Sequence, residues 1–162
     1  MQILWAPWRM DYIVALKPKN CIFCEKAKEK EDAKNFVLFR GESAFTLLNI
    51  YPYNNGHLMI APYRHLDGLE KLSVEELLEL MKLAQRSVAI LASTLKAEGF
   101  NLGINQGKVA GAGIEEHVHM HVVPRWGGDT NFMPILGNTR VIPESLESTY
   151  AKLCPLFQGE PR

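Results

Sequence analysis

Three histidines alternate with apolar residues in the stretch His117-Val118-His119-Met120-His121-Val122-Val123. Because successive side chains of a β-strand point to opposite faces, this alternation predicts a strand over 117–123 with all three imidazoles on one face. The apolar side chains between them would point into a core. The whole chain has only 5 histidines, and a neutral imidazole can bind a metal, transfer protons or attack phosphorus. We therefore interpret this stretch as the centre of a functional site.

The composition predicts one ordinary domain that carries no broad attraction for a polyanion. Of the 162 residues, 18 are basic and 18 acidic, so the formal net charge is zero. We therefore expect no nucleic acid and no membrane as partners, and any anionic ligand must be held by local groups. The first residues lack the form of a signal peptide, and no apolar stretch approaches the roughly 20 residues of a membrane span. These features predict a cytoplasmic protein.

The chain is expected to consist of an arm, a domain and an extension. Residues 1–18 form an N-terminal arm with Trp5 and Trp8, which should pack on the domain or a second subunit, or contact the substrate. Residues 19–126 form the domain. Residues 127–162 form a C-terminal extension that should pack on the same domain or on the partner subunit.

Hydrophobic periodicity and turn signals predict an α+β fold with an antiparallel sheet of about five strands, one long helix and shorter helices. Besides the histidine strand, strands are expected at 36–40, 44–48, 57–61 and 100–105, with a further short strand at 139–142. Helices are expected at 21–30, 74–97 and 143–156. After Pro124 the chain is expected to be irregular through Asn131.

The long helix has start and stop signals in the sequence. Ser73 can cap its N-terminus, and Glu76 three residues later completes a capping box. Apolar residues recur at steps of three and four, which gives the helix one apolar face. Gly99 is expected to end it.

A glycine-rich stretch, residues 107–113, lies just before the histidines. Glycine lets the main chain approach a ligand closely, and successive N–H groups can hold phosphate oxygens. Glycines alone more often mark a mobile loop. Beside a row of histidines, we interpret them as part of a phosphoryl- or nucleotidyl-transfer site.

The histidine stretch resembles the signature of the histidine triad (HIT) superfamily of nucleotide hydrolases and transferases. Asn49, eight residues before His57, begins a segment similar to the ribose-binding segment of that family, and Gln106 lies eleven residues before His117. The resemblance covers roughly residues 20–126 and implies the HIT-like fold. The arm, together with residues 124–132, more narrowly resembles bacterial diadenosine tetraphosphate phosphorylases.

The resemblance implies a two-step nucleotidyl transfer. His119 corresponds to the nucleophile, which attacks the α-phosphorus and forms a nucleotidyl-histidine; water then accepts the nucleotide in a hydrolase and phosphate in a phosphorylase. His121 should bind phosphate oxygens or help to protonate the leaving group, and His117 belongs to the same catalytic group. His57 should touch the bridging phosphates, with a structural role as the alternative.

Other residues are expected to bind the nucleotide. By the resemblance, Asn49 would bond the ribose hydroxyls, and Gln106 lies where the family often carries an amide near the phosphates. Phe45 and Leu47 could wall the base, with plain core packing as the alternative. The remaining nucleotide-binding candidates are Asn105, Gly111, Ala112 and Gly113.

Cys21 and Cys24 have the C-x-x-C spacing that places two thiolates on one zinc ion. His65 and His117 are the candidates for the other two ligands, as in zinc-bearing relatives of the superfamily. A closed site of four protein ligands would be structural, and magnesium could accompany the substrate. The rival interpretation is a redox dithiol. Cys154 is expected to be a packed free thiol.

Three functions compete. The leading one is a phosphorylase of dinucleoside polyphosphates such as diadenosine tetraphosphate, and the second is a HIT hydrolase of dinucleoside polyphosphates or adenylate conjugates. The third, of another class, is a zinc-stabilised nucleotide-binding signalling module. A uridylyltransferase is the weakest interpretation, because Val118 stands where that family has proline. Members of the HIT family are homodimers whose sheets continue across the interface, so we expect a homodimer or a higher homo-oligomer.

Overall fold

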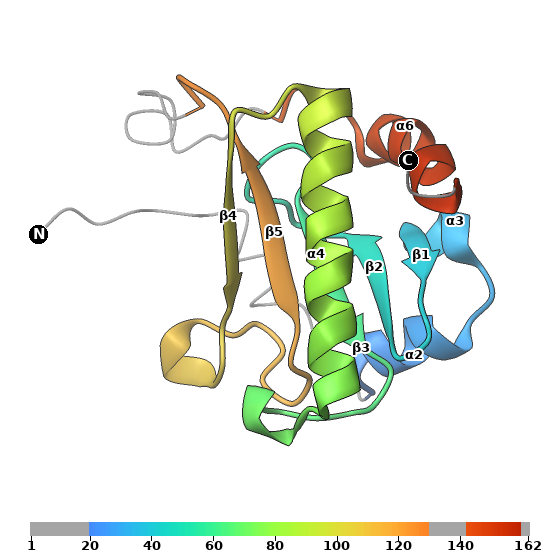
Figure 1. Ribbon diagram of the computed structural model, residues 1–162, viewed down its shortest axis with the longest axis vertical. Coiled ribbons are helices and arrows are strands. Elements are labelled where there is room, and N and C mark those ends of the chain that lie inside the picture. Colours follow the sequence, from blue (N-terminus) through green and yellow to red (C-terminus); the bar gives the residue numbers. More distant parts are fainter. Residues whose placement is uncertain (1–19, 130–141, 160–162) are drawn as a thin grey trace, which may run out of the picture.

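The computed structural model describes residues 20–129 and 142–159. Within them the chain forms one five-stranded antiparallel sheet in the order β1-β2-β3-β5-β4 (Figure 1). The strands are β1 (Val37–Arg40), β2 (Ala44–Leu48), β3 (Leu58–Pro62), β4 (Gly99–Ile104) and β5 (Met120–Arg125). The predicted α+β class and the number of strands are confirmed. The arm, residues 1–18, and most of the short strand expected at 139–142 lie outside the described residues.

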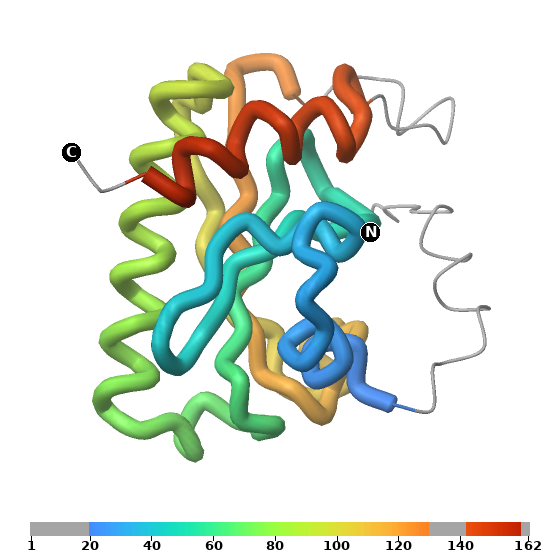
Figure 2. The backbone as a smooth tube through the Cα atoms, turned by 90° about the vertical axis from the view of Figure 1, so that its right-hand side faces the viewer, coloured from blue at the N-terminus to red at the C-terminus, as the bar shows by residue number. Residues whose placement is uncertain are grey.

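The helices lie on both sides of the sheet. They are α2 (Ile22–Lys28), α3 (Asp32–Asn35), α4 (Val74–Leu95) and α6 (Leu146–Gln158), with short 3-10 turns η1 (Leu69–Lys71) and η2 (Lys108–Ala110). The long helix α4 crosses one face of the sheet, and α2 lies on the other face (Figures 1 and 2). Helix α6 packs beside β1 and α4, where Tyr150 Oη donates to the carbonyl of Val37. No helix among the described residues is long and apolar enough to cross a membrane.

Alternation along the strands separates two cores. Ala44 and Leu48 of β2 join a cluster under α4, whereas Phe45 and Leu47 of the same strand join a cluster with Phe23 of α2. Val118 and Val122 belong to the cluster under α4. The apolar residues of the histidine stretch therefore point into the core as predicted, and the histidines between them lie on the α2 side of the sheet.

The histidine strand begins and ends later than predicted. It starts at Met120, not His117, because the β3 ladder ends at the pair Ile60–Met120 and the carbonyl of Pro62 accepts a hydrogen bond from the His117 ring instead. The strand then continues through Pro124 to Arg125, where we expected irregular chain. Proline is tolerated at this point because β5 no longer pairs with β3 beyond Val122.

The predicted start of α4 is confirmed and its predicted end is wrong. Ser73 Oγ accepts the N–H of Glu76 at 3.3 Å, and the Glu76 carboxylate accepts the N–H of Ser73 at 2.8 Å. The helix ends at Leu95, and Lys96 turns the chain with a φ of 53°. Gly99 already belongs to β4, so an unfavourable lysine, not glycine, occupies the left-handed position.

The C-terminal helix also differs from its predicted bounds of 143–156. It is capped by Ser145, whose Oγ accepts the N–H of Ser148, and it extends to Gln158 in spite of an internal proline at position 155. Ile142 lies in no strand.

Candidate active site and Cys/His cluster

His119 is a buried imidazole whose tautomer is fixed by the main chain. Its Nδ1 lies 2.8 Å from the carbonyl oxygen of His117, and a carbonyl can only accept, so Nδ1 carries the proton and Nε2 carries the lone pair. The side chain is 4% exposed, and burial lowers its pKa. Burial favours the neutral form of the ring, whereas the hydrogen bond to the carbonyl raises the pKa and fixes Nε2 as the nitrogen that carries the lone pair.

Aromatic rings pack against His119. The ring centre of Phe23 lies 4.8 Å from that of His119 and 5.1 Å from that of His117. The ring of His121 lies 4.8 Å away on another side. Our sequence analysis missed Phe23 as a site residue. Its place between the two cysteines of the C-x-x-C motif was the one signal in the sequence, and its contact with the histidines depends on how α2 packs on the sheet.

His57 lies beside the triad, where the sequence placed it. The residue is fully buried and its Nε2 is 3.0 Å from Nδ1 of His121. Its own Nδ1 accepts the N–H of Tyr53 at 3.0 Å. The ring of Tyr53 lies 4.7 Å from that of His57 and 5.9 Å from that of His121. Tyr53 is a second neighbour of the site that sequence reasoning missed.

Asn49 contacts the same histidine at the end of β2. Its Nδ2 lies 3.4 Å from Nδ1 of His57, and its Oδ1 accepts the N–H of Tyr51 at 2.9 Å. Its main-chain N–H donates to the carbonyl of His57. The predicted ribose ligand therefore lies next to the histidine pair and also shapes the loop between β2 and β3.

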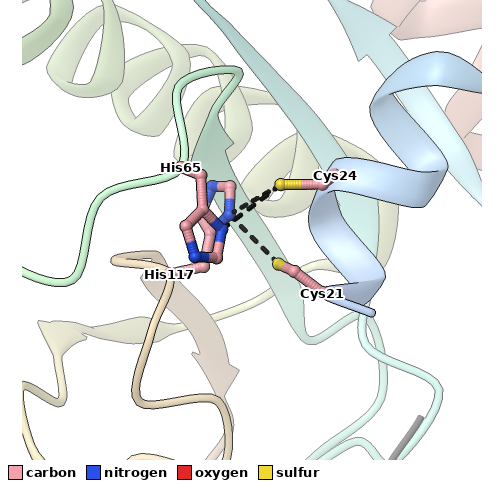
Figure 3. A group of neighbouring side chains, drawn as sticks. All are labelled: Cys21, Cys24, His65 and His117. Carbon is pink, nitrogen blue, oxygen red and sulfur yellow. Dashed lines mark hydrogen bonds between the residues drawn. The ribbon is translucent and has the colours of Figure 1, made fainter. Parts of the chain in front are cut away.

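Cys21, Cys24, His65 and His117 converge from three separate segments (Figure 3). All their ligand atoms lie within 4.8 Å of one another. The Cys21 Sγ–His117 Nδ1 distance is 3.2 Å, Cys24 Sγ–His65 Nδ1 is 3.3 Å and Cys24 Sγ–His117 Nδ1 is 3.7 Å. A tetrahedral zinc with Zn–S of about 2.3 Å and Zn–N of about 2.0 Å separates its ligand atoms by roughly 3.3–3.8 Å. The residues present therefore fit such an ion in number and type, and these three Cys–His distances are close to its spacing.

His117 presents the correct nitrogen to this cluster. Its Nε2 lies 2.9 Å from the carbonyl oxygen of Pro62, so Nε2 carries the proton and Nδ1 is the atom that could bind a metal. Burial lowers the pKa of His117 to about 4. A neutral imidazole is the form that binds a metal.

Arginine side chains hold α2, which carries the two cysteines, and the segment that carries His65. Arg40 of β1 donates to the carbonyls of Lys26 and Ala27 at the end of α2, and to the Asp32 carboxylate. Arg64, the neighbour of His65, donates from Nε and Nη2 to the Glu76 carboxylate at 2.7 Å each. The cluster is therefore anchored both to β1 and to the start of α4.

The residues predicted to wall the base lie on the histidine side of the sheet. Phe45 and Leu47 are almost completely buried in the cluster with Phe23, and Phe45 stacks on Tyr63 with ring centres 5.5 Å apart. This packing is the core role that the sequence left as the alternative for both residues.

The glycine-rich loop begins beside η1. Gln106 Oε1 accepts the N–H of Leu69, and its Nε2 donates to Glu70, both at 3.0 Å. These contacts tie the side-chain amide of Gln106 to the η1 turn. Asn105 lies immediately before Gln106 in the chain. Gly107 and Gly111 both have a left-handed φ near 80° on either side of η2, which explains the need for glycine there. Ala112 and Gly113 lead back toward the histidines, and Ile114 packs against the cluster with Phe23.

Comparisons with known proteins identify the family. The HIT domain family model matches residues 30–128. The chain is 39% identical over 170 residues to AP-4-A phosphorylase of Mycobacterium tuberculosis, covering 99% of this chain and 87% of that protein. It is 34% identical over 89 residues to bis(5'-adenosyl)-triphosphatase of Dictyostelium discoideum, covering 55% of this chain and 59% of that one. The chain belongs to the HIT family, as its histidine stretch predicted.

A solved structure of similar fold carries a metal. It is a zinc-bound histidine triad family protein from Mycobacterium smegmatis, with a TM-score of 0.69 and 28% identity, covering 86% of this chain and 94% of that chain.

Proposed function

We propose that this protein is a HIT-family phosphorylase of dinucleoside polyphosphates such as diadenosine tetraphosphate. The observation that carries the proposal is His119, whose Nδ1–H is held by the His117 carbonyl so that Nε2 is the nucleophilic atom. The enzyme names of the two curated relatives support the class of substrate, and the near full-length match to AP-4-A phosphorylase favours phosphate as the acceptor.

The reaction has two balanced steps. Nε2 of His119 forms a bond to the α-phosphorus while the bridging P–O bond breaks, and the electron pair leaves with the nucleoside triphosphate. The positive charge that develops on the ring is stabilised by the His117 carbonyl, which accepts its Nδ1–H. An oxygen of inorganic phosphate then attacks the same phosphorus and breaks the P–N bond. This step regenerates neutral His119 and releases ADP when the substrate is diadenosine tetraphosphate.

The neighbouring residues are proposed to take the roles that the resemblance implies. His121 and His57 would bind the phosphates, with a structural role as the alternative for the buried His57, and Asn49, beside His57, would bond the ribose. The loop from Asn105 to Gly113 would hold phosphate oxygens on main-chain N–H groups. Phe45 and Leu47 are almost completely buried beside Phe23, so they would support the base only from beneath, through this core cluster.

The Cys/His cluster is proposed to hold one structural zinc ion. Two thiolates and two imidazoles form a closed site, so the ion would supply folding energy and rigidity, not an activated water. The zinc-bound relative supports this assignment. Magnesium bound with the polyphosphate stays a prediction.

We further propose a cytoplasmic homodimer joined along β4. This strand is one of the two edges of the sheet, and its Leu102 is 46% exposed. An exposed strand edge offers unpaired main-chain groups that a second copy can pair with. Sedimentation of the full-length protein would test this arrangement.

The function is tested by incubating the protein with diadenosine tetraphosphate, with and without inorganic phosphate, and separating the products by anion exchange. We expect ADP and ATP only when phosphate is present. AMP and ATP regardless of phosphate would make the protein a hydrolase, an activity that the name of the Dictyostelium relative supports as the second candidate. No turnover of any dinucleotide or adenylate conjugate would favour a nucleotide-binding module instead.

A further inference from the structure

The carboxylate of Asp129 accepts hydrogen bonds from three other residues. Its Oδ2 lies 2.6 Å from Nε of Arg125 and 2.8 Å from Nδ2 of Asn54, and Nη2 of Arg125 donates to its Oδ1 at 2.8 Å. The main-chain N–H of Trp126 donates to Oδ2 at 3.2 Å. The side chain of Asp129 is only 10% exposed, so solvent competes weakly for these bonds. The carboxylate therefore has a well-defined place in the fold.

The contact between Asn54 and Asp129 joins two segments that are 75 positions apart in the chain. Asn54 lies in the loop between β2 and β3, whereas Asp129 follows β5. The main-chain ladder between β3 and β5 does not extend beyond Val122. Past this point the side chain of Asn54 makes the connection, because its Nδ2 also donates to the carbonyl of Pro124 at 3.2 Å. The Asn54–Asp129 contact thus links the loop to β5 where the ladder stops.

The same loop is closed at its base by main-chain hydrogen bonds. The N–H of Asn49 donates to the carbonyl of His57 at 2.9 Å, and the N–H of His57 donates to the carbonyl of Asn54 at 3.2 Å. Gly56 has a φ of 71°, and a Cβ there would lie 2.6 Å from a methyl carbon of Leu95 in α4. Only glycine lets the loop lie this close to the helix. Asn49 is therefore connected to Asp129 through two main-chain bonds and the side chain of Asn54.

Arg125 fixes Asp129 from the side of the sheet. Besides its two bonds to the carboxylate, it donates from Nη1 to Oδ1 of Asn101 in β4 at 2.8 Å. Two bonds between an arginine and one carboxylate restrict the orientation of both groups. Asp129 is thus held by β5 and β4, the rigid part of the structure, and offers its Oδ2 to the loop.

We propose that Asp129 is a positioning residue that, through Asn54, holds the loop between β2 and β3 so that Asn49 meets the ribose hydroxyls of the nucleotide. This inference rests on the proposed function and assigns the ribose part of it to a contact outside the histidine site. Asp129 itself touches no substrate. It would set the affinity for the ribose, whereas His119, oriented by the carbonyl of His117, would carry out the chemistry.

The first test needs no nucleotide. Amide hydrogen exchange of the full-length protein, followed by NMR, reports how often the N–H of Asn49 opens. We expect Asp129→Ala and Asn54→Ala each to speed this exchange about tenfold and to leave the amides in the middle of α4 unchanged. Glu31→Gln is the control, because Glu31 is an exposed carboxylate paired with Lys34. A wild-type exchange rate at Asn49 in folded Asp129→Ala would overturn the inference.

The second test compares two nucleotides by calorimetry: AMP, and dideoxyadenosine monophosphate, which lacks both ribose hydroxyls. We expect Asp129→Ala to weaken AMP about tenfold and the dideoxy nucleotide by less than about twofold. Both nucleotides carry the same phosphate, so a change in charge near Arg125 would affect them equally. With diadenosine tetraphosphate, KM should rise while kcat stays within about twofold of wild type.

A merely structural role gives different results. It would weaken both nucleotides equally, and that outcome would contradict the positioning role. The double variant Asn54→Ala/Asp129→Ala should bind AMP no more weakly than Asp129→Ala, because both changes remove one contact, whereas additive losses would show that Asp129 does not act through Asn54. If wild-type protein binds both nucleotides equally, the ribose role fails together with that part of the proposed function. Hydrogen exchange then still shows whether Asp129 holds the loop.

Discussion

The main-chain oxygen of His117 accepts the Nδ1–H of His119 at 2.8 Å, while the ring of the same His117 lies in the Cys/His cluster. One residue therefore belongs to both centres: its side chain contributes to the candidate metal site and its main chain orients the candidate nucleophile. The ring of Phe23 packs on both histidines and fixes their relative position.

The first prediction concerns His119. Replacing it with alanine or glycine removes the only group proposed to form the covalent intermediate, so kcat should fall by about a thousandfold or more. The fold should survive, because the cluster and both cores are formed by other side chains. Turnover of diadenosine tetraphosphate and far-ultraviolet circular dichroism measure the two effects. Wild-type-like activity in a folded variant would contradict the nucleophile assignment.

The second prediction concerns the metal. We expect about one zinc ion per chain by elemental analysis, and Cys24→Ser should lose it and lower the melting temperature by about 5–15 °C. Cys154→Ser is the matched control, because Cys154 lies in α6 beside Tyr150 and takes no part in the cluster. If the native protein contains no metal and both Cys21 and Cys24 react freely with a thiol reagent, the zinc assignment is wrong.

Local signals in the sequence were sufficient for much of this fold. The alternation around His119 placed Val118 and Val122 in the core, and the Ser73–Glu76 pair gave the start of α4 because a capping box is contained within four residues. The C-x-x-C motif predicted a metal cluster because the spacing of its two thiols is set by one helical turn.

What the sequence could not give depends on neighbours distant along the chain. The start of β5 at Met120 follows from the end of its ladder with β3 at the pair Ile60–Met120, and Phe23 reaches the histidines only once α2 packs under the sheet. Lys96 took the left-handed position that we assigned to a glycine. The order of the imidazole tautomers likewise depends on which main-chain groups meet each ring.

The third prediction follows from Glu76, a buried carboxylate. The hydrogen bonds from Arg64 lower its pKa in the folded state, and Ser73 contributes in the same direction. Because the folded pKa lies below the ordinary value of 4.5, this carboxylate stabilises the fold above that pH, and the stabilisation is lost as the pH falls through the folded pKa. Glu76→Gln should therefore be less stable than wild type near neutral pH and lose less further stability on acidification.

Urea unfolding at neutral pH and at about pH 3.5 measures this effect. Glu42→Gln is the control, since that residue is exposed in the turn between β1 and β2. If Glu76→Gln and wild type lose equal free energy of unfolding between the two pH values, the ion pair with Arg64 does not contribute to acid sensitivity.

The fourth prediction concerns Lys96 at the end of α4. A left-handed conformation costs an L-residue about 1 kcal/mol relative to glycine. Lys96→Gly should therefore raise the free energy of unfolding by about 0.5–1 kcal/mol relative to Lys96→Ala, which also loses the charge but keeps the strained backbone. Equal stability of the two variants would show that the φ of 53° at this position does not carry strain.

The fifth prediction tests whether the cluster orients the nucleophile. His65 is exposed and contacts Cys24, so His65→Ala removes one proposed zinc ligand while His117 and His119 keep their side chains. We expect a lower zinc affinity, measured by competition with a chelator, together with a kcat reduced about 10-fold and a nearly unchanged KM. The reason is that a loosened His117 no longer holds its carbonyl against Nδ1 of His119. Loss of zinc with wild-type kcat would show that the two centres share His117 without being coupled through it.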